Sequence, residues 1–171
     1  MEDFQPNITT ENWIPIDKAY LSVVRIGFTL IHALGLIVAA IFIFLLPSPA
    51  HIIPSLVASV LLCSFLWLFF IWAPRRTKRM QYLLRELDIN FQSGYLFWQM
   101  VSISNNRIQH MEVRQGPIER RYGLATLVIY TAGTQGSELK IPGLILPQAQ
   151  QLKSLLLNNI NAEEADAEEQ L

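Results

Sequence analysis

Two long runs without a charged residue constrain this chain more than any other feature. The first extends from Ile26 to Leu46 and the second from Ile52 to Ala73. At about 1.5 Å per residue, a helix formed by either run crosses the roughly 30 Å hydrocarbon core of a bilayer. A soluble helix of this length normally shows a polar face, and neither run has one. The sequence therefore predicts two transmembrane helices, at residues 26–46 and 52–73.

The composition agrees with a membrane anchor joined to one small domain. Of 171 residues, 51% are hydrophobic and only 16% are charged, whereas about a quarter is usual. The segment Pro47–His51 between the runs is long enough only for a tight turn, so we expect the two helices to form a hairpin. The first run also starts too late, and lacks the basic start, to be a cleaved signal peptide.

Basic residues predict how the hairpin is oriented. Lys18 and Arg25 precede the first run, the connecting turn has no Lys or Arg, and a cluster follows the second run. That cluster consists of Arg75, Arg76, Lys78 and Arg79. The positive-inside rule therefore places both termini in the cytoplasm, with residues 1–25 as an N-terminal cytoplasmic segment. Setting topology is the plain role of the cluster, and attraction of anionic membrane lipid, at about 1 kcal/mol per residue, is the alternative.

A few polar and small residues stand out inside the runs. His32 is the single histidine there, and we expect a neutral imidazole bonded to Ser64, because a proton pathway needs several ionisable groups. Ser55, Ser59 and Cys63 recur every four residues and make a stripe that lets helix backbones approach closely. We expect the stripe to pack the hairpin on itself, with oligomerisation as the alternative.

After Arg79 the pattern changes to short segments separated by Gly and Pro, which is typical of antiparallel strands. The predicted strands are residues 81–87, 88–92, 95–103, 107–113, 125–131 and 138–141. Turns are predicted at Ser93-Gly94 and around Gly133 and Gly136. The pattern indicates a meandering antiparallel sheet.

The last apolar segment has helical spacing. It begins near Pro147, and its apolar residues are Ala149, Leu152, Leu155, Leu156 and Ile160. We expect an amphipathic helix that covers one end or face of the sheet. The sequence thus predicts a cytoplasmic domain at residues 80–160 and an acidic, disordered tail at residues 161–171.

The central part of the domain resembles a known family. The segments Asn106–Leu127, Tyr130–Gly133 and Ile141–Leu144 are similar to the signature of the bacterial membrane-anchored pleckstrin-homology-like (PH-like) proteins, the YdbS-like family. The order of two spans followed by the domain also matches. The resemblance implies a mostly β, α+β domain with a PH-like fold, a bent antiparallel barrel closed by a C-terminal helix. It also implies a multi-pass protein of the bacterial plasma (inner) membrane.

The family-like motif contains the candidate interaction residues. These are Arg107, Gln109, His110, Arg114, Arg120 and Arg121. We expect residues 116–123, together with Arg114, to form a basic loop that contains the last two. One interpretation is a site for a phosphate headgroup or a peptide. The other interpretation is structural: Arg107 pairs with a carboxylate or with backbone carbonyls, and His110 is half-buried in a strand.

The sequence contains no motif for catalysis. It has no His-Glu-x-x-His, nucleophile elbow, phosphate loop or dinucleotide-binding glycine motif, and one cysteine excludes an intramolecular disulfide. We therefore expect no enzyme, no catalytic residue, no metal and no cofactor, and no basic surface interleaved with aromatic residues for nucleic acid.

Three functions remain after these exclusions, and one of them, a transporter or pore component, would require oligomers with His32 facing the interface. The first is a membrane-anchored interaction or scaffold protein that assembles with itself or with another membrane protein, including a larger PH-like relative. The alternative is a sensor or binder of anionic lipid or of a small ligand at the cytoplasmic membrane surface.

Overall fold

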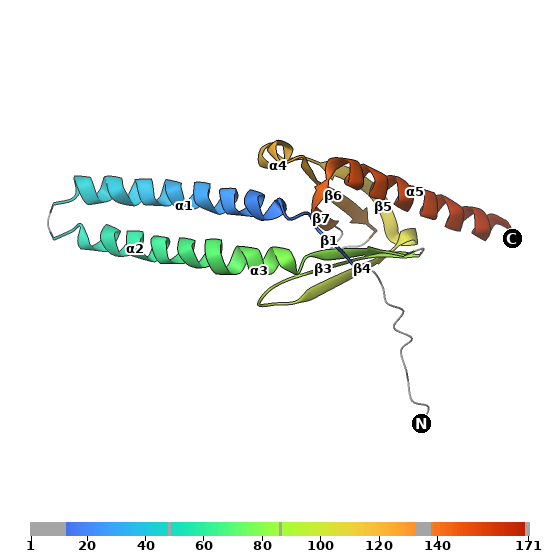
Figure 1. The fold of residues 1–171 in the computed structure, drawn as a ribbon, viewed down its shortest axis with the longest axis horizontal. Coiled ribbons are helices and arrows are strands. Elements are labelled where there is room, and N and C mark those ends of the chain that lie inside the picture. Colours follow the sequence, from blue (N-terminus) through green and yellow to red (C-terminus); the bar gives the residue numbers. More distant parts are fainter. Residues whose placement is uncertain (1–12, 48, 86, 133–137, 170–171) are drawn as a thin grey trace, which may run out of the picture.

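A long helical hairpin extends from one end of a domain built from two small sheets and a C-terminal helix (Figure 1). The structure is a computed structural model that describes residues 13–47, 49–85, 87–132 and 138–169, with side chains up to residue 161. The first twelve residues, the predicted turn at Gly133 and Gly136, and the end of the tail lie outside the described residues.

The helical hairpin has two arms. The first is α1 (Tyr20–Leu45). The second runs without a break through α2 (Ile52–Trp67), the π-helix η1 (Leu68–Trp72) and α3 (Ala73–Lys78). Both arms are long and apolar enough to cross a membrane. The two predicted spans are therefore helical, but the second arm continues past Ala73 and carries Arg75, Arg76 and Lys78 on its last turns.

Proline explains why the second arm contains a π-helix. The Ala73 N–H donates to the Leu68 carbonyl, five residues back, instead of to the Phe69 carbonyl. Pro74 has no N–H, so it cannot donate to Phe69 either. The Phe69 carbonyl instead accepts a hydrogen bond from Arg25 Nε of α1 at 3.4 Å, and the Arg25 guanidinium lies 4.6 Å from the centre of the Phe69 ring. Arg25 thus supplies a hydrogen-bond donor to the Phe69 carbonyl and links the two arms.

The domain contains two antiparallel sheets. The first has the order β1-β2-β3-β4, with strands Ile14–Pro15, Gln81–Leu84, Asp88–Ser93 and Gln99–Ser104. The second has the order β5-β6-β7, with strands Ile108–Arg114, Leu124–Thr131 and Glu138–Ile145. The connecting and closing helices are η2 (Asn105–Arg107), α4 (Pro117–Arg121) and α5 (Leu146–Glu169). No ladder joins the sheets among the described residues, so the antiparallel sheets and the C-terminal helix agree with a PH-like domain but a closed barrel is not seen.

Several local features differ from the sequence-based expectations, including two strand bounds: the strand predicted at 81–87 ends at Leu84, and the one predicted at 138–141 extends to Ile145. Residues 95–98 form a turn, so the third predicted strand begins only at Gln99. The segment 116–123 is not a basic loop, because α4 occupies most of it. The chain before α1 supplies β1, which pairs with β2. Helix α5 extends to Glu169, where we expected a disordered tail.

The core lies between the inner faces of the two sheets and is covered by α5. Its fully buried members include Ile89 of β3, Leu127 and Ile129 of β6, and Ile141 of β7. Helix α5 contributes Ala149, Leu152 and Leu156 as predicted, whereas Leu155 is 42% exposed. Burial of this interdigitated apolar surface is the main stabilising term for so small a domain.

The domain and α1 meet at a close contact around Gly143. Its φ is +70°, and a Cβ there would lie 2.8 Å from Tyr20 Cβ and 3.2 Å from Ile16 Cδ1. The Gly143 carbonyl accepts the Asp17 N–H at 2.8 Å, and the Met80 carbonyl accepts the Ile16 N–H at 3.2 Å. Because Ile16 is also buried in the core, the first arm is fixed to the domain just before it starts.

Candidate functional site

A polar cluster lies on the outer face of the β5-β6-β7 sheet. Successive outward positions of β5 place His110, Glu112 and Arg114 in one row, because side chains alternate across a strand. Arg114 Nε donates to Glu112 Oε2 at 2.7 Å, and His110 Nε2 lies 3.3 Å from Glu112 Oε1. Arg114 Nη2 also donates to the Tyr130 hydroxyl of β6 at 2.6 Å. We call these four residues the sheet-face cluster.

The sheet-face cluster is ordered internally and nearly neutral. The His110 and Tyr130 rings stack with centroids 6.0 Å apart and planes 25° apart. The hydrogen bond from Arg114 holds the pKa of the Glu112 carboxyl below its ordinary value, and the Glu112 carboxylate raises the pKa of Arg114 in return. Since the guanidinium already has a carboxylate and a phenol as partners, an incoming phosphate would have to displace them. The geometry favours a surface that meets another surface of mixed polarity.

The structure brings together only part of the predicted interaction set. His110 and Arg114 belong to the sheet-face cluster. Arg107 ends η2, where its carbonyl accepts the Ala132 N–H at 3.0 Å, and Gln109 lies at the irregular register of β5 between residues 108 and 110. Both side chains are exposed. The six candidates therefore do not form one site.

The remaining two candidates lie on α4. Glu119 of this helix accepts the Gly116 N–H and the Thr126 hydroxyl, each at 2.8 Å, and so fixes α4 to β6. Arg120 and Arg121 are exposed, and no carboxylate pairs with either among the residues that the structure describes.

Glu112 and Tyr130, which connect the cluster, were not among the residues predicted from the sequence. Glu112 lies in the quoted motif but was passed over in favour of cations. The alternation of His110, Glu112 and Arg114 at every second position was the signal that identifies a shared strand face. Tyr130 required the register in which it pairs with His110, which the sequence alone does not give.

The basic residues that were predicted to set the topology form a basic surface at the domain end of the second arm. We call Arg75, Arg76, Lys78 and Arg79 the basic collar. The Arg76 guanidinium lies over the Trp72 ring at 4.7 Å, and those of Arg75 and Arg79 lie over the Tyr95 ring at 5.5 and 5.8 Å. All four collar residues are exposed.

A cavity of about 450 Å³ opens beside the collar, between the two sheets. Arg76 and Tyr20 of the helical arms line it together with Phe91 and Lys140 of the sheets. Lys140 is paired with Glu138 at 3.2 Å, whereas no carboxylate among the described residues pairs with Arg76 at this cavity. The mixed lining suits a ligand that has both polar and apolar parts.

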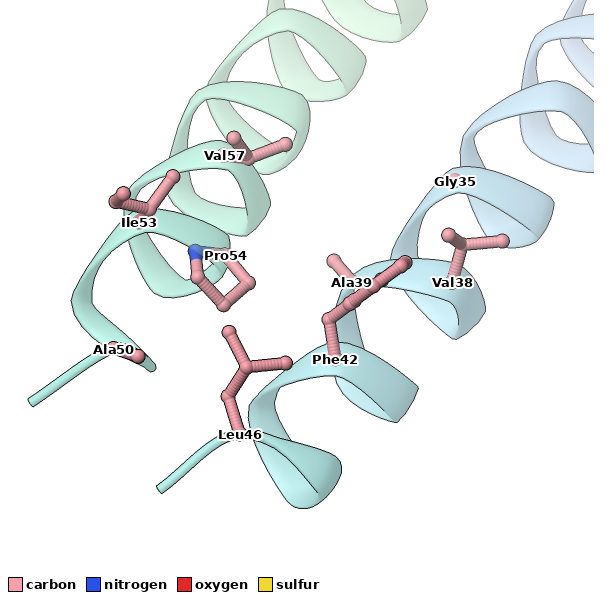
Figure 2. A pocket seen from close by; sticks show the side chains of 9 residues that line it. All are labelled: Gly35, Val38, Ala39, Phe42, Leu46, Ala50, Ile53, Pro54 and Val57. Atoms are coloured by element: carbon pink, nitrogen blue, oxygen red, sulfur yellow. The ribbon is translucent and has the colours of Figure 1, made fainter. Parts of the chain in front are cut away.

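An apolar gap lies between the arms at the end of the hairpin farthest from the domain. Figure 2 shows side chains of both arms facing this gap, whose volume is about 370 Å³. Its lining residues are Gly35, Val38, Ala39, Phe42, Leu46, Ala50, Ile53, Pro54 and Val57. The predicted small-residue stripe does not close it, because Ser59 and Cys63 are exposed on α2. For these two residues, the expectation that they pack the hairpin on itself is wrong.

His32 and Ser64 join the arms nearer the domain, as predicted. His32 Nε2 lies 3.2 Å from Ser64 Oγ, and His32 Nδ1 lies 2.8 Å from the Phe28 carbonyl. A carbonyl only accepts, so the Nδ1 atom carries the proton. Within the described residues, no three His, Cys, Asp or Glu side chains gather as metal ligands.

Comparisons with known proteins find one matching family and a related protein. The family model described as the bacterial PH domain matches residues 26–160. Over 101 residues the chain is 34% identical to the transmembrane protein YdbS of Bacillus subtilis (strain 168). The aligned region covers 59% of this chain and 62% of that protein, so the chain spans less than two thirds of its relative's length. No solved structure matches.

Proposed function

Because the chain belongs to the bacterial PH-domain family, we propose that it is a membrane-anchored interaction module whose domain binds another membrane protein or a second copy of this chain. The observation that carries the proposal is the sheet-face cluster. His110 and Arg114 of this cluster are exposed and Glu112 and Tyr130 are partly exposed, yet the four side chains already hold one another in place, so binding a partner costs little further ordering. Tyrosine and arginine are also the residue types enriched where proteins bind each other.

The surroundings of the cluster support this proposal. Charge pairing inside the cluster favours a protein surface over a phosphate, because Glu112 already neutralises Arg114. The exposed residues Ser59 and Cys63 give the second arm a small-residue face that a neighbouring helix fits. We propose a bacterial plasma membrane location with both termini cytoplasmic, since Lys18, Arg25 and the basic collar all lie at the domain ends of the arms. The module carries out no catalytic step in this proposal.

In-cell photocrosslinking tests the proposal. A photoreactive residue at His110 reports on the sheet face, and one at Ser59 reports on the exposed face of the second arm. Gln150, exposed on α5, is the matched control. We expect a discrete protein adduct from position 110 and none from position 150, with mass spectrometry to identify the partner or a second copy. Adducts with lipid only, or equal labelling from positions 110 and 150, would contradict the proposal.

A second candidate function is binding of anionic lipid or of a small amphipathic ligand at the membrane surface. The observation that favours it is the 450 Å³ cavity, with Arg76 at its edge. Native mass spectrometry of the full chain from bilayers containing phosphatidylglycerol would count retained lipid. Arg76→Gln should lower that count, whereas Arg121→Gln, on α4, should not. Equal retention in both variants would rule this candidate out.

A further inference from the structure

Three consecutive large apolar side chains protrude from the turn between β3 and β4. We call residues Gly94–Trp98 the β3–β4 turn. Leu96, Phe97 and Trp98 are 66%, 89% and 65% exposed. Single exposed apolar residues are common in proteins, but an adjacent group of this size marks a place where the protein meets another apolar phase.

The backbone of the turn holds these side chains outward. Gly94 has a φ of +125°, and a Cβ at this position would lie only 1.9 Å from the Phe97 carbonyl oxygen. The chain therefore folds back on itself so tightly that only glycine fits at position 94.

The β3–β4 turn lies beside the domain end of the second arm. Arg79 Nη1 donates to the Tyr95 carbonyl at 3.4 Å, and the Tyr95 ring lies beneath two guanidinium groups of the basic collar. Leu96 and Phe97 line a cavity of about 320 Å³ together with Trp72 and Arg76. Figure 1 shows the tip of this hairpin reaching back alongside α3. The three protruding side chains are thus level with the last turns of the helix.

That level is the boundary between hydrocarbon and water. The uncharged part of the second arm ends at Ala73, and the basic collar follows. Tryptophan and positively charged side chains gather at this depth of a membrane on the side where basic residues accumulate. Aromatic side chains with one polar end gain most from such a mixed environment.

We propose that Leu96, Phe97 and Trp98 insert into the interface of the leaflet in which the two arms end. The turn then holds the domain against the lipid at a third point, besides the two helical arms. A partner protein is the other occupant that an apolar patch suggests. Lipid is favoured because the patch is continuous with the membrane-facing end of the arm and is flanked by cations that attract anionic headgroups. The inference does not depend on the assembly proposed above.

A matched pair of leucines tests the insertion. Leu96 and Leu87 are both 66% exposed, and they lie beyond opposite ends of β3, whose six residues span about 20 Å at roughly 3.3 Å each. Leu96→Cys and Leu87→Cys, each in a Cys63→Ser background, are labelled with an environment-sensitive fluorophore. The full chain is placed in phosphatidylcholine bilayers, with and without phosphatidylglycerol and with a nitroxide quencher carried high on the acyl chain. Phe97→Cys gives a second label position in the turn if Leu96→Cys does not fold.

We expect the label at position 96 to shift its emission to the blue and to lose fluorescence to the lipid-borne quencher in both bilayers. The label at position 87 should behave as in water. Equal behaviour of the two labels would overturn the proposal. Lipid quenching that appears only with phosphatidylglycerol would still support insertion, with the basic collar contributing to it. A blue shift without lipid quenching would also overturn it, in favour of a protein occupant.

Discussion

Glu112 holds the sheet-face cluster together, since both His110 and Arg114 contact its carboxylate. The hydrogen bond from Arg114 keeps the pKa of this carboxyl below its ordinary value of about 4.3. Because the pKa is lower in the folded protein than in the unfolded chain, the ionised carboxylate stabilises the fold at pH values above the pKa of the unfolded chain. This contribution is lost as pH falls through the folded value. We therefore expect the cluster to loosen only in acid, below the ordinary glutamate range.

Arg114→Gln tests this coupling directly. The substitution removes the charged donor, so the pKa of Glu112 should rise toward the ordinary glutamate value. Carboxyl chemical shifts followed by NMR during an acid titration give that pKa. Arg120→Gln, which removes an exposed arginine of α4 outside the cluster, is the control and should leave the pKa of Glu112 unchanged. An unchanged Glu112 titration would show that Arg114 does not set its charge.

Arg25 is the second residue with a specific role, because it donates to the carbonyl that Pro74 leaves without a partner. Arg25→Met keeps an unbranched stem but removes the donor, and we expect a loss of about 1 kcal/mol in the free energy of unfolding. In a Pro74→Ala background residue 74 regains an N–H, so the same substitution should cost less. A double-mutant cycle by thermal or denaturant unfolding in detergent measures this coupling. Additive effects would contradict the assigned role of Arg25.

At the scale of elements, the two arms are held together by few polar contacts. Ser64→Ala removes the hydroxyl that faces His32, and hydrogen bonds between membrane helices contribute about 0.6–1.7 kcal/mol. We expect Ser64→Ala to lower the free energy of unfolding by an amount in that range. Ser59→Ala is the control: like Ser64, whose hydroxyl donates to the Leu61 carbonyl at 2.9 Å, Ser59 donates to a carbonyl of its own helix, that of Ser55, but its side chain is exposed and does not face His32. Equal losses in unfolding assays in detergent micelles would show that the contact between the arms is not stabilising.

Elements with a strong hydrophobic pattern were predictable from the sequence, and those set by a local interaction were not. The two spans and the six later strands follow from runs and alternation that burial imposes. The start of the strand predicted at 95–103 was placed too early because Phe97 continues the alternation of Val101 and Ile103, although residues 95–98 still belong to the turn that begins at Gly94. Helix α4 was missed because its start depends on Glu119 accepting the Gly116 N–H. The π-helix was missed because it depends on Pro74 together with Arg25 from the other arm.

The candidate site was predictable only in part, because some of its residues come together only in the folded molecule. His110 and Arg114 were chosen for their charge, and their strand spacing places them on one face. The partners Glu112 and Tyr130 become meaningful only when two strands are in register. The exposed apolar residues of the β3–β4 turn gain significance only when the domain packs beside the end of an arm.

The orientation of the domain on the membrane depends on how rigidly α1 is joined to it. Asp17 Oδ1 accepts the Ala19 N–H at 2.7 Å at the start of the arm. Ile16 is buried in the core, and Tyr20 packs over Gly143 of β7. Because the chain passes from core to span within a few residues, motion of the domain relative to the arms requires this contact to open.

Gly143→Ala should open that contact. The new Cβ would meet Tyr20 at 2.8 Å, and the φ of +70° is itself unfavourable for alanine. Left-handed strain of about 1–2 kcal/mol and overpacking of about 1–3 kcal/mol together predict a loss of about 3 kcal/mol. Gly123→Ala is the matched control: its φ is +66°, but nothing lies within 4 Å of the new Cβ, so only the strain remains. The distance between spin labels at Phe44 on α1 and Gln150 on α5 should have a broader distribution in Gly143→Ala than in Gly123→Ala. Equal widths of the two distributions would mean that Gly143 does not fix the domain to the membrane arm.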